Sequence, residues 1–235
     1  DYCKAHIENG AKKVIISAPA VNVNKTIVYG VNHEEITSND EIISNASCTT
    51  NCLAPMAKVL HQELGIIRGM MTTIHSYTGD QGTIDRRHRD LYRARAGAMN
   101  MIPTSTGAAT ALKHVLPELE GKIEGSAIRV PIPNVSCVDL TVETKVDIPS
   151  PLHANHLLNI HAMQDMLGIM KVETQPLVSA DFNHSSESCI VAADQTKTVG
   201  KHLLRLLAWY DNEWGFSCRM ADLAKYIGEK YVNGN

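Results

Sequence analysis

The chain has 235 residues, a formal net charge of −3 at pH 7 and 44% hydrophobic residues, so it can bury a core in one large or two small domains. The slight acidity argues against a general nucleic-acid-binding protein, and no apolar run approaches the roughly 20 residues of a membrane-spanning helix. The six cysteines form no Cys-x-x-Cys pair and the start lacks a secretion signal, which indicates free thiols in a reducing cytoplasm.

The first 44 residues predict a small unit of helix and parallel strands. A helix-like segment ends near Gly10 and is followed by an apolar strand at 14–17. Further strands are expected at 26–31 and 41–44. A short apolar run that directly follows a helix is typical of a parallel sheet, whose strands are covered on both faces.

The residues after Cys48 predict a helix that ends at Gly65. Its apolar residues recur at steps of three and four, at Leu53, Ala57, Leu60 and Leu64. Pro55 leaves the start of the helix open. As a first-turn proline it places the start near Ala54, which the sequence alone favours, whereas a start near Thr49 requires a proline inside the helix.

The remaining sequence is rich in strand patterns. A strand at 70–74 precedes a long polar stretch, 79–101, and such a stretch in a compact domain usually has a function or lies at an interface. The other expected elements are a helix at 107–119, a strand at 138–142, a helix at 153–167, strands at 177–181, 188–193 and 202–210, and a last helix with an apolar stripe of Phe216, Met220, Leu223, Ile227 and Tyr231. This order predicts an α+β fold with a mostly antiparallel sheet and flanking helices.

One cysteine has the surroundings of a nucleophile. Most free cysteines are small buried hydrophobes, and Cys52 keeps that interpretation. Cys48 instead lies among hydroxyl and amide residues in 44–52 (SNASCTTNC), near a helix start whose N–H groups favour the thiolate. His75, which follows the strand at 70–74, is either a structural hydrogen-bonding residue or the general base for this thiol.

Two further segments predict anion binding. Arg129 lies between apolar residues on a strand, where a phosphate or carboxylate partner explains an arginine better than a surface ion pair does. Residues 102–109 place hydroxyls and a glycine at an expected helix start. That pattern fits an anion site, and an ordinary N-cap explains it as well.

Taken together, these motifs resemble the phosphorylating glyceraldehyde-3-phosphate dehydrogenases over essentially the whole chain. The three signatures are SNASCTTNC, His75 in Thr-Thr-Ile-His, and residues 209–216 (WYDNEWGF), in the order of the family. The chain has no Gly-x-Gly-x-x-Gly near its start, so the resemblance implies that most of the dinucleotide-binding half is absent.

The resemblance also implies a division of the chain. Residues 1–47 are then the C-terminal remnant of a parallel α/β (Rossmann) domain, and residues 48–212 are the catalytic domain. Residues 213–235 form a helix that packs on the dinucleotide-binding domain. Without that domain, we expect the apolar stripe of the helix to be exposed and these 235 residues alone to bind NAD poorly.

By the same resemblance, individual residues acquire roles. The Cys48 thiolate adds to the substrate aldehyde, hydride leaves to NAD, and phosphate cleaves the resulting thioester. His75 promotes the attack and assists proton removal. The other implied contacts are Thr78 and Arg129 for the substrate phosphate, Ser47, Thr49, Thr106 and Gly107 for inorganic phosphate, and Asn212, Phe216 and Ser17 for the cofactor, with no metal. Arg93 and Arg95 resemble residues of a loop at the subunit interface and receive no catalytic role.

The expected function is oxidative phosphorylation of glyceraldehyde 3-phosphate to 1,3-bisphosphoglycerate with NAD, or with NADP. The resemblance implies a cytoplasmic homotetramer with no nucleic-acid or membrane partner. One alternative is erythrose-4-phosphate dehydrogenase, which shares the Cys-His pair but commonly departs from the Thr106-Gly107 pattern. A cofactor-free cysteine hydrolase or acyl transferase is another, and the signature around Asn212 argues against it. The third is an inactive fragment of the dehydrogenase.

Overall fold

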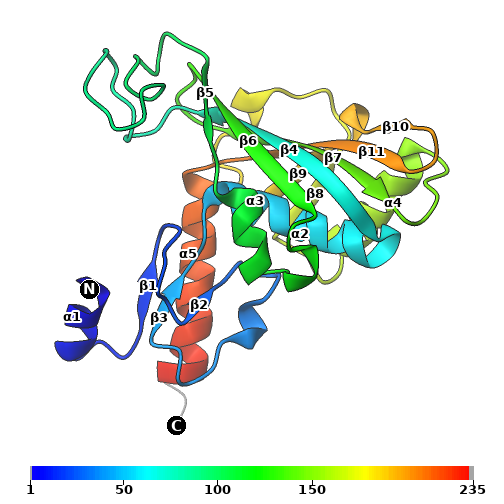
Figure 1. Cartoon of the computed structure of the whole chain (residues 1–235). Coiled ribbons are helices and arrows are strands. Elements are labelled where there is room, and N and C mark those ends of the chain that lie inside the picture. The colour runs from blue at the N-terminus through cyan, green and yellow to red at the C-terminus, as the bar shows by residue number, and fades with distance from the viewer. Residues whose placement is uncertain (1, 233–235) are drawn as a thin grey trace.

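The computed structural model describes residues 2–232, and its first part is a small parallel sheet (Figure 1). The helix α1 (Tyr2–Glu8) precedes β1 (Val14–Ile16), and β3 (Ile42–Ser44) lies between β1 and β2 (Lys25–Thr26) with all three strands parallel. The expected strand at 26–31 is wrong beyond its first residue. The Asn32 side chain bonds the backbone of Val28 and Thr26 and folds this segment into a turn, so Ile27 and Val28 are buried without extending the strand.

The larger sheet has eight strands and occupies the middle of the chain. Its members are β4 (Ile66–Ser76), β5 (Ile102–Ser105), β6 (Ile123–Val130), β7 (Ser136–Thr144), β8 (Met170–Glu173), β9 (Cys189–Ala192), β10 (Lys197–Val199) and β11 (Leu203–Tyr210). Their order is β5-β6-β4-β7-β11-β9-β8, with β10 paired to β11. Only β4/β6 and β8/β9 are parallel pairs, which confirms the predicted α+β fold with a mostly antiparallel sheet.

One face of the large sheet is covered by helices. The helix α2 (Cys48–Leu64) packs against β4, β7, β9 and β11, and α4 (Pro151–Ala162) packs against α2 and β8 (Figure 1). Val138, Leu140 and Val142 of β7 are buried in the resulting core, as their alternation predicts.

The helix α2 starts earlier than the sequence alone favours. Ser47 is its N-cap and accepts a hydrogen bond from the Thr50 amide, so Pro55 lies inside the helix. A proline there forfeits one backbone hydrogen bond. Most of the helix, 12 of its 17 residues, is buried, and tertiary packing therefore outweighs the local preference. The helix ends at Gly65, whose positive φ of 68° suits a C-cap glycine.

Two other predicted elements differ from the structure. The expected helix at 107–119 is divided into α3 (Ala108–Ala111) and the 3₁₀ turns Leu112–His114 and Pro117–Leu119, because the residue before Pro117 avoids helical backbone angles. The expected strand at 177–181 is a 3₁₀ turn, Ser179–Phe182, since the Asp181 carboxylate accepts a hydrogen bond from the Val178 amide and curls the chain. Two further 3₁₀ turns are His33–Glu35 and Ala193–Gln195.

The last helix, α5 (Trp214–Ile227), continues into a π-helical turn, Gly228–Val232, and lies beside the small sheet (Figure 1). Its Leu223 and Ile227 are buried with Ile27, Ile36 and Ile43. The expectation that the apolar stripe is exposed is therefore wrong for these two residues, because the small N-terminal unit covers them. The stripe residues Phe216 and Met220 are half-buried.

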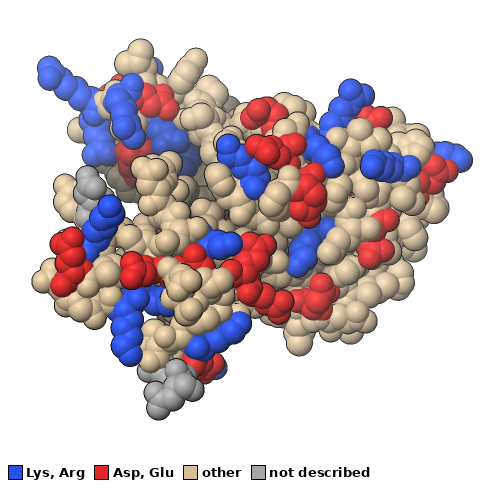
Figure 2. Space-filling model, turned by 60° about the horizontal axis from the view of Figure 1, so that its bottom comes forward, with Lys and Arg blue, Asp and Glu red and all other residues tan. Residues whose placement is uncertain are grey.

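The composition bears on both the distribution of charge on the surface and the length and polarity of the helices. On the face shown in Figure 2, acidic side chains form a row across the middle, and basic side chains lie above and below it. Within residues 2–232, every helix is too short or too polar to span a bilayer.

We predict that one surface histidine makes stability depend on pH. His161 of α4 contacts the Asp165 carboxylate with Nδ1 at 2.9 Å and the Glu63 carboxylate with Nε2 at 3.2 Å. Partial burial lowers the pKa of His161, but its hydrogen bonds with Glu63 and Asp165 outweigh this and raise the pKa above 6.5. The stabilisation is therefore complete below about pH 6.5 and is lost as pH rises through the higher pKa of the folded state.

Replacing His161 with glutamine should lower the free energy of unfolding by about 0.5–1 kcal/mol at pH 5.5 and by less at pH 9, as measured by urea denaturation. His156→Gln, at an exposed position on the same helix, is the control. An equal loss for His161→Gln at both pH values would contradict the prediction.

Candidate active site

Residues from three parts of the chain surround one cavity of about 410 Å³. The small N-terminal unit contributes 17–19 and 46, the large sheet and α2 contribute Cys48, His75 and Thr78, and the C-terminal region contributes Asn212 and Phe216. Ser17 and Ser47, which were also predicted to be site residues, lie in its wall. The structure thus brings together seven of the eleven predicted residues around one space.

A tight turn aims Cys48 at this cavity. The buried Ala46, between β3 and α2, has a φ of 57°, in the left-handed region that non-glycine residues rarely adopt. Ser47 then caps α2, and Cys48 is the first residue of the helix. Strained backbone of this kind is common at functional sites, and here it turns the chain so that the thiol faces His75.

Cys48 and His75 are in contact. The Cys48 Sγ lies 3.4 Å from the His75 Nε2, at the end of β4. Burial raises the pKa of the Cys48 thiol, while the positive charge of Arg129 and hydrogen bonds with Thr49 oppose that rise. Burial therefore acts against the thiolate that the N–H groups of the helix start favour. The thiol needs a base, and His75 is the group within reach.

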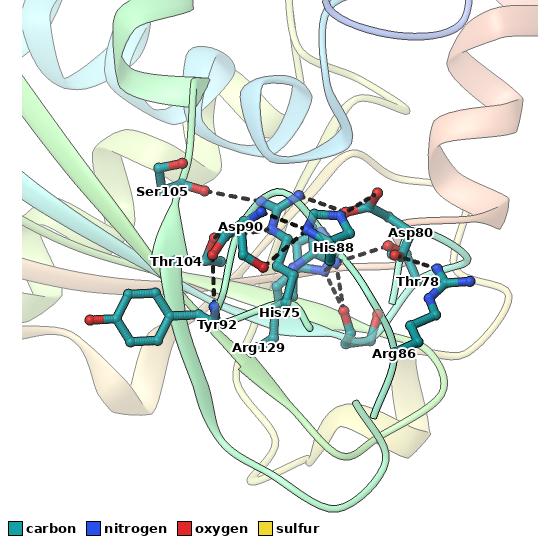
Figure 3. Close-up of polar contacts among 12 residues, drawn as sticks. His75, Thr78, Asp80, Arg86, His88, Asp90, Tyr92, Thr104, Ser105 and Arg129 are labelled. Atoms are coloured by element: carbon teal, nitrogen blue, oxygen red, sulfur yellow. Dashed lines mark hydrogen bonds and ion pairs between the residues drawn. The ribbon is translucent and has the colours of Figure 1, made fainter. Parts of the chain in front are cut away.

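His75 is neutral at physiological pH. Burial and the nearby charge of Arg129 lower the pKa of His75 to about 4, so its ring can accept a proton near pH 7. Its Nδ1 lies 2.8 Å from the backbone oxygen of Ser76 and 3.1 Å from Nη1 of Arg129 (Figure 3). The imidazole is thus held at one end and faces the thiol with the other.

Strand register places Arg129 beside His75. The parallel strands β4 and β6 align these two residues, and Arg129 also donates to the Ser76 carbonyl at 2.9 Å and to the Thr78 hydroxyl at 3.3 Å (Figure 3). Its Nε is buried and has no hydrogen-bond acceptor among the described residues. A guanidinium with an unused buried N–H suits an incoming anion, which agrees with the predicted phosphate contact of Arg129 and Thr78.

A second arginine adds positive charge, and the sequence reasoning gave it no role. Arg93, in the long loop after β4, pairs with Asp80 at 2.8 Å and donates to the Thr104 hydroxyl at 3.0 Å. Its charge contributes to lowering the pKa values of both His75 and Arg129. In the sequence, Arg93 belongs to a group of arginines within 79–101, and the resemblance assigned it to an interface loop without a catalytic role.

Two serines hold the side chain of Asn212. Its Oδ1 accepts hydrogen bonds from the hydroxyls of Ser76 at 2.9 Å and Ser136 at 2.8 Å. Ser76 is the last residue of β4, Ser136 is the first residue of β7, and Asn212 lies just beyond β11. These strands are neighbours in the sheet, so the three residues meet at one end of it. With Oδ1 occupied, the side-chain amide of Asn212, which lies in the cavity wall, donates one N–H of Nδ2 to the Glu213 carboxylate at 3.4 Å and retains the other. Neither serine stands out in the sequence.

Three of the predicted inorganic-phosphate residues lie away from this cavity. The Thr49 hydroxyl is buried and bonds the Tyr210 hydroxyl at 2.9 Å. Thr106 accepts a hydrogen bond from the Ala108 amide, and Gly107 lines a neighbouring cavity of about 530 Å³. The two cavities share Pro19 and Ala46. Among residues 2–232, no cluster of three or more histidine, cysteine or acidic side chains could hold a metal ion.

Tyr210 connects α2 to the large sheet. Its buried hydroxyl bonds both Thr49 and Thr73, the latter at 2.8 Å, and its ring lies edge-on to His75. We predict that Tyr210→Phe lowers the free energy of unfolding by about 1–3 kcal/mol, because it leaves two buried hydroxyls with one partner fewer. Denaturant unfolding measures this loss. Tyr92→Phe, at an exposed position, is the control, and an unchanged stability of Tyr210→Phe would contradict the prediction.

Comparisons with known proteins match this arrangement. Residues 47–212 fit the family model described as "Glyceraldehyde 3-phosphate dehydrogenase, C-terminal domain". Proteins named glyceraldehyde-3-phosphate dehydrogenase from Cereibacter sphaeroides and Xanthobacter flavus are each 55% identical to the chain, over 95% and 97% of its length. The chain spans 67% and 68% of those two relatives. The protein of that name from Pseudomonas aeruginosa is also 55% identical, over 95% of the chain.

Proposed function

This chain belongs to the glyceraldehyde-3-phosphate dehydrogenase family, and we propose that it carries the catalytic part of an enzyme that converts glyceraldehyde 3-phosphate to 1,3-bisphosphoglycerate. The observation that carries the proposal is the contact of 3.4 Å between Cys48 Sγ and His75 Nε2, beside an arginine with an unused buried N–H. A thiol, a neutral base and an anion site are the parts needed to form a thioester from a phosphorylated aldehyde.

In the proposed reaction, His75 Nε2 takes the proton of the Cys48 thiol as the sulfur adds to the aldehyde carbon, and it passes this proton to the aldehyde oxygen, which becomes a hydroxyl. The same nitrogen then assists proton removal from the resulting hydroxyl as the thioester forms. Arg129 and Thr78 hold the phosphate of the substrate, which fixes the aldehyde near the sulfur. Binding the substrate at its non-reacting end lowers the entropic cost of the attack.

Inorganic phosphate then attacks the thioester carbon, and the carbon–sulfur bond breaks, which releases the acyl phosphate and the Cys48 thiolate. We propose that Ser47, Thr49, Thr106 and Gly107 form its site. Ser47 lies in the wall of the cavity, and Gly107 lines the adjoining one. To bind inorganic phosphate, the Thr49 hydroxyl must break its hydrogen bond with the Tyr210 hydroxyl or form a second hydrogen bond beside it.

The family implies a dinucleotide cofactor, and we propose NAD. When bound, the dinucleotide supplies the hydride acceptor. The residues around the cavity fit its carboxamide end, because Ser76 and Ser136 hold Oδ1 of Asn212, and Nδ2, which donates one N–H to Glu213, retains a second N–H. Ser17 and Phe216 lie in the same wall and complete the proposed cofactor contacts. Residues 1–47 and 213–235 are the proposed dinucleotide side of the site, and 48–212 the catalytic side.

Asn212→Ala should raise the KM for NAD about tenfold, the loss expected for one buried hydrogen bond, while the KM for the aldehyde changes little. Steady-state kinetics, with each substrate varied separately, measures the two KM values. Asn100→Ala, in the loop before β5, is the control. Equal rises in both KM values would argue that Asn212 acts on the fold of the site and does not bind the cofactor.

The proposed function is tested by NADH formation with the full-length chain. We expect absorbance at the NADH band only when glyceraldehyde 3-phosphate, NAD and inorganic phosphate are all present. Faster turnover of erythrose 4-phosphate would identify the sister activity. Cleavage of an activated ester without NADH formation from the aldehyde would instead support a hydrolase.

We also propose a cytoplasmic homotetramer. The outer side of the large sheet exposes apolar side chains, including Ile67, Met70, Val199 and Leu203, which fits contacts between subunits. Light scattering coupled to size exclusion measures the mass in solution, and a monomer would overturn this part.

A further inference from the structure

The helix α4 is apolar on both of its faces. Its inner face is buried through Ala154, Leu158 and Ala162. Its outer face and the turn that follows it expose four large apolar side chains, Leu152 (76% exposed), Ile160 (37%), Met163 (70%) and Leu167 (74%). A surface helix ordinarily carries polar and charged residues on its outer face, so these four side chains need an explanation.

The sequence around this face lacks acidic residues, lysine and arginine. None of these residue types occurs between Asp147 and Asp165. Single apolar residues on a surface are common, whereas four along one helix without an intervening charge are typical of a contact with another molecule. Helices that bind membrane surfaces carry lysine or arginine on their polar side, and α4 has neither, which argues against a lipid partner.

The spacing of the exposed residues is symmetric. Leu152 and Leu167 lie equally far along the chain from the middle of this segment, and so do His156 and Met163. The amide of Leu167 donates to the carbonyl of Gln164, one of the turns that continue beyond the end of α4. When two copies of the segment lie antiparallel, Leu152 of one copy therefore meets Leu167 of the other, and His156 meets Met163. Such self-complementarity is the requirement for a contact around a two-fold axis.

The polar groups at the two ends of the face also complement each other. His153 and His156 lie in the N-terminal half, whereas Asp165 and Glu63 place two carboxylates at the C-terminal end, on either side of His161. Antiparallel pairing sets the histidines of one copy near the carboxylates of the other. It also sets the positive N-terminal end of each helix beside the negative C-terminal end of its neighbour. A second copy of this chain thus fits both the apolar and the polar groups.

We propose that the outer face of α4 binds the same face of a second copy of the chain, with the two helices antiparallel around a two-fold axis near residue 160. The helix lies on the helix-covered side of the large sheet (Figure 1). The contact is therefore distinct from the proposed subunit contacts on the outer side of that sheet, and it joins one oligomer to another. A stable interface buries about 800 Å² on each partner, and one helix face with a short turn offers less, so the association is weak.

Sedimentation velocity of the full-length chain tests this contact. Over subunit concentrations from about 1 to 200 µM, where weak complexes dissociate, the weight-average mass should rise above that of the basic oligomer. Met163→Glu should abolish the rise, because each copy then brings a carboxylate into the apolar contact. The urea denaturation curve should stay the same, since Met163 is exposed.

Two double variants test the antiparallel register. Leu152→Lys/Leu167→Glu and Leu152→Lys/Leu167→Lys remove the same apolar groups and differ in the sign of the second charge. The two positions are about 22 Å apart along one chain, so in 0.15 M salt their charges interact mainly across the contact. The like-charged variant should have a dissociation constant at least about tenfold higher than the oppositely charged one, because each pair occurs twice around the axis. In 1 M salt the two values should converge.

A mass that stays constant with concentration would overturn the proposal, and so would equal behaviour of the two double variants in 0.15 M salt. The chain is also sedimented with vesicles of phosphatidylcholine and phosphatidylserine. Vesicle binding that Met163→Glu removes, together with a constant mass, would identify a lipid surface as the occupant. A constant mass without vesicle binding would assign the face to a different protein.

Discussion

Cys48→Ser is expected to reduce NADH formation from glyceraldehyde 3-phosphate by at least about 10⁴-fold, because the hydroxyl that replaces the thiol is a far weaker nucleophile at neutral pH. The contact with His75 cannot compensate, since a neutral imidazole does not ionise a serine hydroxyl appreciably. The substitution is nearly isosteric, so the fold should remain. Steady-state kinetics, with circular dichroism as a check of folding, measures the effect.

Cys218→Ser is the matched control. Cys218 is a partly exposed free thiol on α5, outside the cavity wall, and its replacement should leave kcat/KM within about twofold. Comparable losses for both variants, or substantial activity in Cys48→Ser, would show that Cys48 is not the nucleophile.

The second large effect concerns His75. His75→Asn should lower kcat/KM by about 10²–10⁴-fold, the usual contribution of a general base. It should also change the pH profile. Because burial and Arg129 lower the pKa of His75 to about 4, the base is already neutral well below pH 6.5, and kcat/KM should fall only as pH drops through about 4.

The fall of kcat/KM at low pH distinguishes a catalytic role of His75 from a structural one. His75→Asn should lose it, whereas Arg129→Met should move it to higher pH by removing a nearby positive charge. His184→Asn, outside the cavity wall, should retain the unsubstituted profile. An inflection near pH 6.5 that persists in His75→Asn would contradict the assignment of the base.

Much of the architecture was predictable from local pattern. The alternation in 138–142 predicted a strand with one buried face, and β7 has it. The apolar runs at 14–17 and 41–44 predicted parallel strands, and β1 and β3 pair in that way. Predictions failed where a single side chain or a proline redirected the backbone. Asn32 folds 27–32 into a turn, Pro117 interrupts the helix after α3, and Asp181 curls 179–182.

The start of α2 shows why local rules have a limit. Pro55 favours a later start, yet the helix begins at Cys48 because a capped, mostly buried helix gains more from packing than one forfeited hydrogen bond costs. The position of the thiol at the first turn follows from that balance, which the rule for proline by itself does not predict.

Local sequence indicated the chemical groups of the site: a cysteine among polar residues, a histidine at a strand end, and an arginine flanked by apolar residues. Only the tertiary structure decided their neighbours. The pairing of β4 with β6 sets Arg129 beside His75, and the shared edge of the sheet places Ser76 and Ser136 on Asn212. These contacts join residues far apart in the chain, and strand register fixes them, because a shift of one residue turns every side chain to the opposite face.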